Sequence, residues 1–290
     1  MNLKMKRMIY IAVIFLLTIT LTKLLYPQEV RESLTYFPID PSLSFLTAET
    51  ILTLQTEKGN DEHFVDWETI SETDKKVYLR QDVSILFRGG FLVDSMYQWK
   101  ENASTLEQLK NVRGEESSLF QSISLHHAEI HLQDDVIKSA QTMTMKNLYI
   151  IDSSFSPLDS FQKPSNKEQS EWKKIVDHVL TEHLNYSWNE LISYFQINRE
   201  NYYEITMLDL ITYNSKPLPG FDQGKSQEII GQLWEGLYKN YLLGIKLSPS
   251  ETISPIGSKV PLILLSKDLT HLYILIEGKD GEKIKLVQEL

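Results

Sequence analysis

Apolar residues are most concentrated near the start of the chain. The run from Met8 to Leu25 spans 18 residues and contains one charged residue, Lys23. A helix of this length covers about 27 Å, close to the thickness of a bilayer's hydrocarbon core. We therefore predict a transmembrane signal-anchor over residues 8–26. Its apolar members are Met8, Ile9, Ile11, Val13, Ile14, Phe15, Leu16, Leu17, Ile19, Leu21, Leu24 and Leu25.

Basic residues set the expected orientation of this anchor. Lys4, Lys6 and Arg7 precede the apolar run, whereas the charges just after it nearly cancel. Positive flanks stay in the cytoplasm, so we expect a cytoplasmic tail over residues 1–7 and an extracytoplasmic remainder. A cleaved signal peptide is the alternative interpretation. No A-x-A-like cleavage site follows the apolar run, which favours an uncleaved, single-pass cell-membrane protein.

Farther along the chain, apolar and polar residues alternate with a period of two, the pattern of half-buried strands. The expected strands are residues 77–87, 91–99, 118–132, 136–143 and 147–151. Gly89 and Gly90 fit a hairpin turn between the first two strands, and residues 133–135 fit a turn between the third and fourth. The polar stretch 102–117 is expected to begin with a short helix, because Ser104 and Glu107 fit a capping box.

Two later stretches have the 3.6-residue period of amphipathic helices. The first follows a capping box of Ser165 and Glu168 and ends before a second box of Ser187 and Glu190, which predicts a separate short helix. Its apolar stripe consists of Trp172, Ile175, Val176, Val179, Leu180 and Leu184. Residues 225–243 form the second strong amphipathic helix, which stops at Gly244.

The order of these elements predicts the fold class. Further strands are expected at residues 202–213, 260–265, 271–277 and 283–290. Strands, helices, a strand, a helix and strands in that order are typical of an α+β fold with mainly antiparallel sheets. We expect a juxtamembrane stalk over residues 27–62, where prolines interrupt the pattern, and an extracytoplasmic domain over residues 63–290. A loop at 153–164 is a candidate boundary between lobes 63–158 and 165–290.

Cysteine usage narrows the class of protein. The 290-residue chain contains no cysteine, which excludes disulfides, thiolate metal ligands, thiol nucleophiles and a lipidated cysteine. Animal extracellular domains usually carry disulfides. The absence of cysteine and the composition rich in lysine and isoleucine therefore indicate a bacterial cell envelope.

The charge balance excludes some partners. The chain has 29 basic and 39 acidic residues, and five of the basic residues but one of the acidic residues lie in residues 1–31. The remainder therefore carries a formal net charge of −14. Such a surface is repelled by phosphate backbones and anionic headgroups, so we do not expect nucleic-acid binding.

The sharpest cluster of chemically active residues is on the strand expected at 118–132. His127, Glu129 and His131 alternate there, so their side chains share one face at about 7 Å spacing. Two imidazoles and a carboxylate suit zinc or another divalent ion, although the spacing matches no metalloenzyme motif. A solvated strand face is the simpler interpretation. Apolar positions also change from odd to even numbers near His126, which predicts a β-bulge there.

No other residues form a recognisable catalytic pattern. The sequence contains no G-x-S-x-G, no S-x-x-K, no P-loop and no G-x-G-x-x-G. His183 falls on the apolar stripe of its helix and is expected to be a hydrogen-bonded core residue. Gly236 lies on the apolar face of the second amphipathic helix, which predicts a close approach of another backbone.

Three functions are compatible with these patterns. The leading hypothesis is a single-pass, membrane-anchored binding protein, acting as a regulatory or accessory subunit of another membrane or envelope protein, without catalysis or a cofactor. The second is a metal-dependent envelope hydrolase that uses His127, Glu129 and His131. The third is a small-ligand pocket between the two lobes, which the tyrosine and tryptophan content permits.

Overall fold

The structure is a computed structural model. It describes residues 34–56, 63–114, 116–153, 156–248 and 251–290. The predicted tail at 1–7, the predicted anchor at 8–26 and residues 27–33 and 57–62 of the predicted stalk lie outside these ranges. Residues 34–290 form one compact unit. In the described part of this unit, no helix is both long enough and apolar enough to cross a bilayer.

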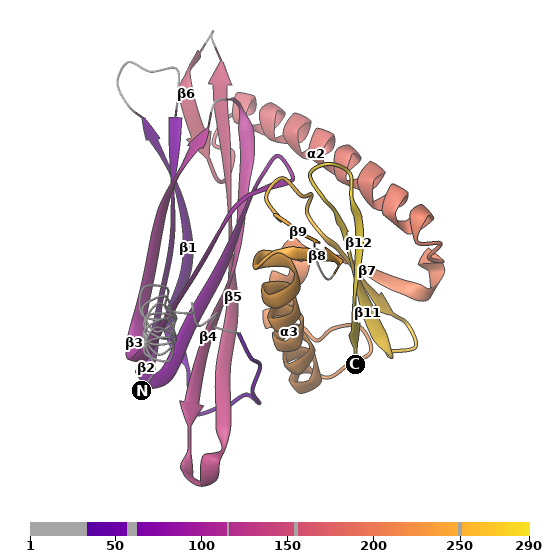
Figure 1. Cartoon of the computed structure of the whole chain (residues 1–290). Helices are drawn as coiled ribbons and strands as arrows, with labels where there is room; N and C mark the ends of the chain where they lie inside the picture. Colours follow the sequence, from indigo (N-terminus) through magenta and orange to yellow (C-terminus); the bar gives the residue numbers. More distant parts are fainter. Residues whose placement is uncertain (1–33, 57–62, 115, 154–155, 249–250) are drawn as a thin grey trace, which may run out of the picture. The chain divides into compact units, whose positions relative to one another are not determined.

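A large antiparallel sheet dominates the first half of the unit, with strand order β1-β2-β4-β5-β6 and with β3 paired to β2 (Figure 1). Its strands are β1 Phe45–Thr56, β2 His63–Arg88, β3 Phe91–Gly114, β4 Ser118–His131, β5 Ile137–Ser153 and β6 Ser156–Phe161. The 3-10 turn η1, Gln133–Asp135, joins β4 to β5. The predicted hairpins at Gly89-Gly90 and at 133–135 are confirmed.

Several strands extend beyond the predicted limits. The stretch 102–117, where we expected a short helix, is largely the second half of β3 and pairs with β2 as far as Gly114. This prediction was wrong because β3 pairs with one neighbour only, so its exposed polar residues resemble a loop or a helix. β1 lies in the stretch expected as a stalk and pairs along its length with β2. β6 lies in the expected loop at 153–164.

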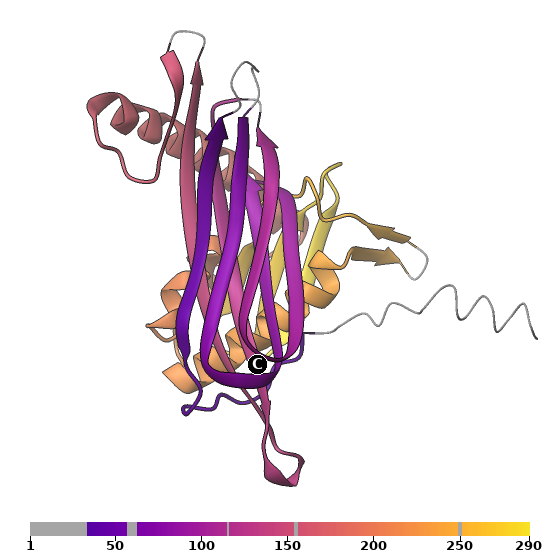
Figure 2. The same cartoon turned by 90° about the vertical axis from the view of Figure 1, so that its left-hand side faces the viewer.

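The hairpin formed by β2 and β3 folds back on itself. The first half of β2 pairs with β1 and with the second half of β3, whereas its second half pairs with the first half of β3 and with β4. The register of β2 and β3 is interrupted between Glu72 and Val77, where the hairpin bends. Two β-layers therefore face each other, joined at the bend, which Figure 2 shows at one end of the long strands.

The second half of the chain forms a smaller antiparallel sheet of order β12-β11-β10-β7 and two long helices. The strands are β7 Tyr202–Thr206, β10 Leu262–Ser266, β11 His271–Glu277 and β12 Lys283–Glu289, with a separate pair β8 Ile245–Ser248 and β9 Glu251–Ile253. The helices are α2 Lys167–Tyr194 and α3 Gln223–Leu237, with short helical segments η2 Arg199–Asn201, η3 Met207–Asn214 and η4 Tyr238–Leu242. The mostly antiparallel, α+β-like architecture is as predicted.

α2 is one continuous helix rather than the two that we predicted. Its N-cap is Asn166, which accepts a hydrogen bond from the Gln169 backbone, and not Ser165. The hydroxyl of Ser187 donates to Glu277 on β11, so it serves a tertiary contact in place of a second cap. Of the predicted apolar stripe, Ile175 and Val179 are exposed. The helix buries a narrower stripe, which includes Leu180 and Leu184.

α3 lies between the two sheets and shares one apolar core with them (Figure 1). Trp234 on α3 belongs to the same buried cluster as Leu125 on β4 and Ile274 on β11. This cluster therefore contains residues from both predicted lobes. The expectation for Gly236 was wrong, because no atom outside its own helix and chain neighbours lies within 4 Å of its added Cβ. The close approach is at Gly231, where Tyr36 fills the space.

The predicted strand at 202–213 ends early. β7 stops at Thr206, whose side chain caps η3 by accepting a hydrogen bond from the Asp209 backbone. The Asp209 carboxylate accepts from the Thr206 backbone in return. This capping box lies inside the period-two pattern, so local hydrogen bonding overrides the alternation.

Candidate functional site

A layer of polar side chains lies between the two β-layers. Thr50 on β1 is 2.7 Å from Ser124 and 2.6 Å from Thr144, measured between hydroxyl oxygens. The Trp67 indole donates to the Ser122 hydroxyl at 2.8 Å. These bonds join side chains of the β1 layer to side chains of the β4–β5 layer. A buried hydroxyl group without a hydrogen-bond partner is energetically costly. These bonds therefore favour one position of the β1 layer over the β4–β5 layer.

The centre of this polar layer is a fully buried carboxylate and imidazole. Asp82 on β2 and His126 on β4 are both 0% exposed, and the His126 Nδ1 is 3.0 Å from the Asp82 Oδ2. The other ring nitrogen of His126 is 2.8 Å from the Thr144 Oγ1, and Ser71 donates to Asp82 across the bend. These hydrogen bonds are buried between the layers, which indicates a structural role for the cluster.

The bulge predicted near His126 does not exist. β4 pairs with β2 and with β5 without any shift in register. The apolar positions change from odd to even numbers because both faces of β4 are buried and each face contacts different parts of the protein. Ile123 and Leu125 face the α3 core, whereas His126 faces the polar layer and Ile130 faces a small apolar cluster beside it.

The three predicted metal ligands lie in different surroundings along β4. The Nε2 of His131 is 2.6 Å from the Glu129 Oε1, and its ring stacks on Tyr78 at a centroid distance of 3.8 Å. His127 and Glu129 are 2% and 7% exposed, so this face of β4 is not a solvated one. Among the residues that the structure describes, no group of three or more histidine, aspartate or glutamate side chains has an arrangement that could hold a metal ion.

The two halves of β3 form the open edge of the folded hairpin. Each half pairs with β2 on one side, and in the described residues no named strand pairs with the other side, where a short segment around Lys259 bonds to the first residues of β3. Every second residue of an unpaired edge directs its peptide N–H and C=O groups outward. β3 therefore presents two unpaired edges, one in each layer. The space between the layers opens to the surface between these two edges.

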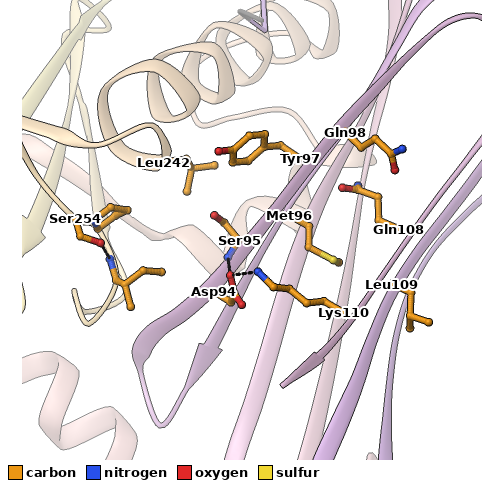
Figure 3. Close-up of a pocket in the computed structure, with 12 residues that line it drawn as sticks. Asp94, Ser95, Met96, Tyr97, Gln98, Gln108, Leu109, Lys110, Leu242 and Ser254 are labelled. Carbon is orange, nitrogen blue, oxygen red and sulfur yellow. Dashed lines mark hydrogen bonds and ion pairs between the residues drawn. The ribbon is translucent and has the colours of Figure 1, made fainter. Parts of the chain in front are cut away.

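The first hollow at this edge has a volume of about 590 Å³ and is drawn in Figure 3. Asp94 in one layer and Lys110 in the other point toward each other there, with 2.6 Å between the Lys110 Nζ and the Asp94 Oδ1. Gln108 lies deeper and donates from Nε2 to the Asp82 carbonyl and the Thr69 hydroxyl. The polar layer thus reaches the bottom of the hollow. Its lining residues are Asp94, Ser95, Met96, Tyr97, Gln98, Gln108, Leu109, Lys110, Leu242, Ser254, Pro255 and Ile256.

A second hollow continues along the same edge toward the hairpin turn and shares Ile256 with the first. Its volume is about 560 Å³. The Nη1 of Arg88 donates to the Arg113 carbonyl at 3.1 Å, so Arg88 spans the gap between the layers. Both hollows are in the range of about 300–1,000 Å³ common for ligand sites. The second is lined by Arg88, Phe91, Leu92, Val93, Val112, Arg113, Ile256, Gly257 and Lys279.

The chain itself occupies one end of this edge with an extended segment. Leu92 donates its N–H to the Ser258 carbonyl at 2.7 Å and accepts from the Gly257 N–H at 2.7 Å. The Val260 N–H donates to the Gly90 carbonyl at 2.9 Å. This segment runs antiparallel to β3. The first half of β3 thus accepts an added strand, and from Asp94 onward no described strand pairs with its outer edge.

Large side chains are exposed beside the open part of the edge. Tyr97 is 47% exposed, Trp99 36% and Leu109 68%. Exposed apolar and aromatic groups next to an unpaired strand edge are typical of interaction surfaces. Lys100 and Glu101 lie in the same stretch, and charges of this kind discourage unselective edge pairing.

His183 lies outside the groove formed by the open edge of β3 and its two hollows, on the face of α2 that meets β11. Burial, assisted by the positive charge of Lys259, lowers the pKa of His183 below its ordinary value, and Glu277 opposes part of this effect. Burial disfavours ionisation of Glu277, but hydrogen bonds from Ser187 and Lys259 outweigh it and lower the pKa of Glu277. We expected a hydrogen-bonded core histidine, and within the described part of the chain the buried Nε2 of His183 has no hydrogen-bond partner.

Sequence patterns did not reveal the open edge. Met96 and Gln108 read as ordinary strand and loop residues, and no motif links Asp94 to Lys110. The sequence signal that could have revealed the edge was the long polar stretch after Trp99. This stretch continues β3 past the bend. The chain matches no protein-family model, no curated protein and no solved structure at a significant level.

Proposed function

We propose that this protein is a single-pass, membrane-anchored binding protein of a bacterial cell envelope, a regulatory or accessory subunit that captures an extended segment of a partner membrane or envelope protein. The observation that carries the proposal is the open edge of β3 beside two adjoining hollows. The predicted anchor would keep the folded unit at the membrane, where such a partner is within reach.

Strand addition accounts for how the edge would bind. An extended segment placed along β3 satisfies the outward N–H and C=O groups and supplies main-chain hydrogen bonds regardless of sequence. Its alternate side chains enter the two hollows, where they are selected by shape and charge. The segment Gly257 to Val260 already pairs with this strand in the same manner.

Photocrosslinking in native membranes tests this function. Tyr97, in the groove, is replaced by a photocrosslinking amino acid in the full-length chain, and trapped proteins are identified by mass spectrometry. Tyr203 on β7 is the matched control, since both are exposed tyrosines on strands, at 47% and 39%. A reproducible partner trapped from position 97 and absent from position 203 supports the proposal. Equal products from both positions, or none from position 97, contradict it.

The hydrolase hypothesis has less support. Glu129 and His131 bond to each other, and the His131 ring is stacked on Tyr78. A metal at this position would have to replace the bond between the two side chains. Metal analysis of the purified protein tests this reading independently of the crosslinking experiment.

A further inference from the structure

We propose that the segment captured at this edge is the C-terminal end of the partner protein, with its terminal carboxylate and an apolar last side chain in the second hollow. This inference rests on the proposed function and names the chemistry of its ligand. It depends on three properties of the groove, which are its charge, its apolar floor and the direction of the strand that it accepts.

The second hollow is basic on an acidic protein. The whole chain carries a formal charge of −10, yet Arg88, Arg113 and Lys279 line this hollow without any carboxylate among the described lining residues. The nearest acidic residue along β3, Asp94, is in an ion pair with Lys110. A basic site on a surface of the opposite sign favours an anionic ligand. Guanidinium groups suit a carboxylate in particular, because their parallel donors match its two oxygens.

The floor of the same hollow is apolar. Leu92 is buried, Val93 and Val112 are half-buried, and Phe91 and Ile256 are each 40% exposed. Covering the exposed parts of these side chains with an apolar group removes apolar area from water, which favours binding. A ligand that fits both properties has a negative charge beside an apolar side chain, as the last residue of a protein does when it is aliphatic or aromatic.

The direction of β3 places the end of an added strand at this hollow. β3 runs from Phe91 toward Gly114, so an antiparallel strand on its first half runs toward Phe91. The chain's own segment at 257–260 runs in this direction and occupies the last part of the edge. An incoming antiparallel strand therefore meets Pro255 and Ile256 and has to end there. Its C-terminus then lies next to Arg88, Arg113 and Lys279.

Peptides that differ only at the C-terminus test the assignment. The probe is a fluorescein-labelled peptide library of about eight residues, which spans the edge from Asp94 to Lys100 at about 3.3 Å per residue. Its final positions are mixed among valine, isoleucine, leucine, phenylalanine and threonine. One preparation has a free C-terminal carboxylate and the other a C-terminal amide. Binding to the full-length protein in detergent is followed by fluorescence anisotropy.

We expect the free-acid library to bind at least about tenfold more tightly than the amide library. The double substitution Arg113→Glu with Lys279→Glu should abolish this preference. The matched control, Lys174→Glu with Lys216→Glu, makes the same charge change at exposed lysines outside the groove and should preserve it. Far-ultraviolet circular dichroism of each variant establishes that the fold is intact.

The outcomes separate this inference from the function on which it rests. Equal binding of the acid and amide libraries, or no binding of either, overturns the C-terminal assignment. If Tyr97 still traps a partner in that case, the edge binds a partner segment that is not a C-terminus and the proposed function stands. If the acid library binds as expected but Tyr97 traps nothing in membranes, the hollow recognises C-termini while the proposed membrane partner is contradicted.

Discussion

Asp94 and Lys110 belong to the same strand, β3, and their side chains meet at the open edge of the folded hairpin, with 2.6 Å between the carboxylate and the ammonium group. The side chains are 26% and 44% exposed, respectively. The ion pair bridges the two layers at the point where the first hollow opens. It lies at the mouth of this hollow, beside the edge that we propose as the binding site.

This ion pair is expected to contribute little to stability. Exposed ion pairs are typically worth about 0.2–1 kcal/mol and weaken as salt is added. A double-mutant cycle with Asp94→Ala and Lys110→Ala, measured by urea unfolding, should therefore give a coupling energy below about 1 kcal/mol. A coupling of several kcal/mol, unchanged by salt, would show that the ion pair stabilises the fold and is not easily displaced by a ligand.

Replacing the buried Asp82 is expected to have a much larger effect. Asp82→Ala leaves His126 and Ser71 without their shared acceptor between the layers. Removing one partner of a buried pair costs about 3–5 kcal/mol, because the other polar group stays buried and unsatisfied. The free energy of unfolding should fall by that order, whereas Asp94→Ala should change it by less than about 1 kcal/mol. Similar losses from the two substitutions would contradict the stabilising role of the polar layer.

Two glycines of α3 should respond to alanine in opposite directions. A Cβ at Gly231 would lie 2.1 Å from the Tyr36 Cδ2 and 2.8 Å from the Gln141 Oε1. Overpacking of this kind costs about 1–3 kcal/mol, so Gly231→Ala should lower the thermal unfolding temperature. Gly236 has no such neighbour within 4 Å, and Gly236→Ala should be stabilising by up to about 1 kcal/mol through helix propensity. A stabilised Gly231→Ala variant would mean that Tyr36 is not packed against α3.

Acidification should weaken the contact between α2 and β11 through His183. Its pKa is below the ordinary value of 6.5 in the folded protein, so at intermediate pH the unfolded chain binds a proton that the folded chain does not. The stability associated with His183 is therefore fully present above about pH 6.5 and is lost as the pH falls toward the lowered pKa. Urea unfolding at a series of pH values should show this loss.

His183→Gln should remove that part of the pH dependence, whereas His178→Gln should preserve it, because His178 is an exposed residue of the same helix. Glu277 contributes with the same sign at lower pH, since its pKa is lowered as well. A His183→Gln profile that matches the unsubstituted protein across pH 5 to 7 would exclude His183 as the responsible group.

Metal removal should leave the protein unaffected. Glu129 and His131 are satisfied by each other, so we expect neither a chelator nor added zinc to shift the thermal unfolding temperature. A metal bound tightly to the folded state would raise that temperature, because ligand binding stabilises the state that binds. A zinc-dependent increase that is lost in both His127→Ala and His131→Ala would revive the hydrolase hypothesis.

The local periodicity of apolar residues was sufficient to predict an element where that element has one apolar face and one polar face. The strands at 260–265 and 271–277 were predicted within two residues of β10 and β11, and the helix at 225–243 corresponds to α3 followed by η4. It failed where tertiary contacts replace that pattern. Ser187 reads as a cap but donates to Glu277 in a distant strand, so one helix was mistaken for two.

The candidate site was beyond the reach of sequence patterns for a related reason. Gln108 is polar because it reaches the Asp82 carbonyl between the layers, but in sequence it resembles a loop residue. The three residues predicted to bind metal share a face of β4, as alternation requires. Glu129 and His131 bond to each other along that face, and the ring of Tyr78 on β2 stacks on His131, a contact that alternation does not reveal.

The sequence by itself determined the alternation of strands, the two amphipathic helices and hence an α+β-like architecture with antiparallel sheets, because these depend on which neighbouring residues share a face. The tertiary structure alone decided where the groove lies. Asp94 and Lys110 are 16 positions apart and would be separated by about 50 Å along a straight strand. They meet because the β2–β3 hairpin bends and folds over the polar layer around Asp82, and that bend leaves both halves of β3 as open edges.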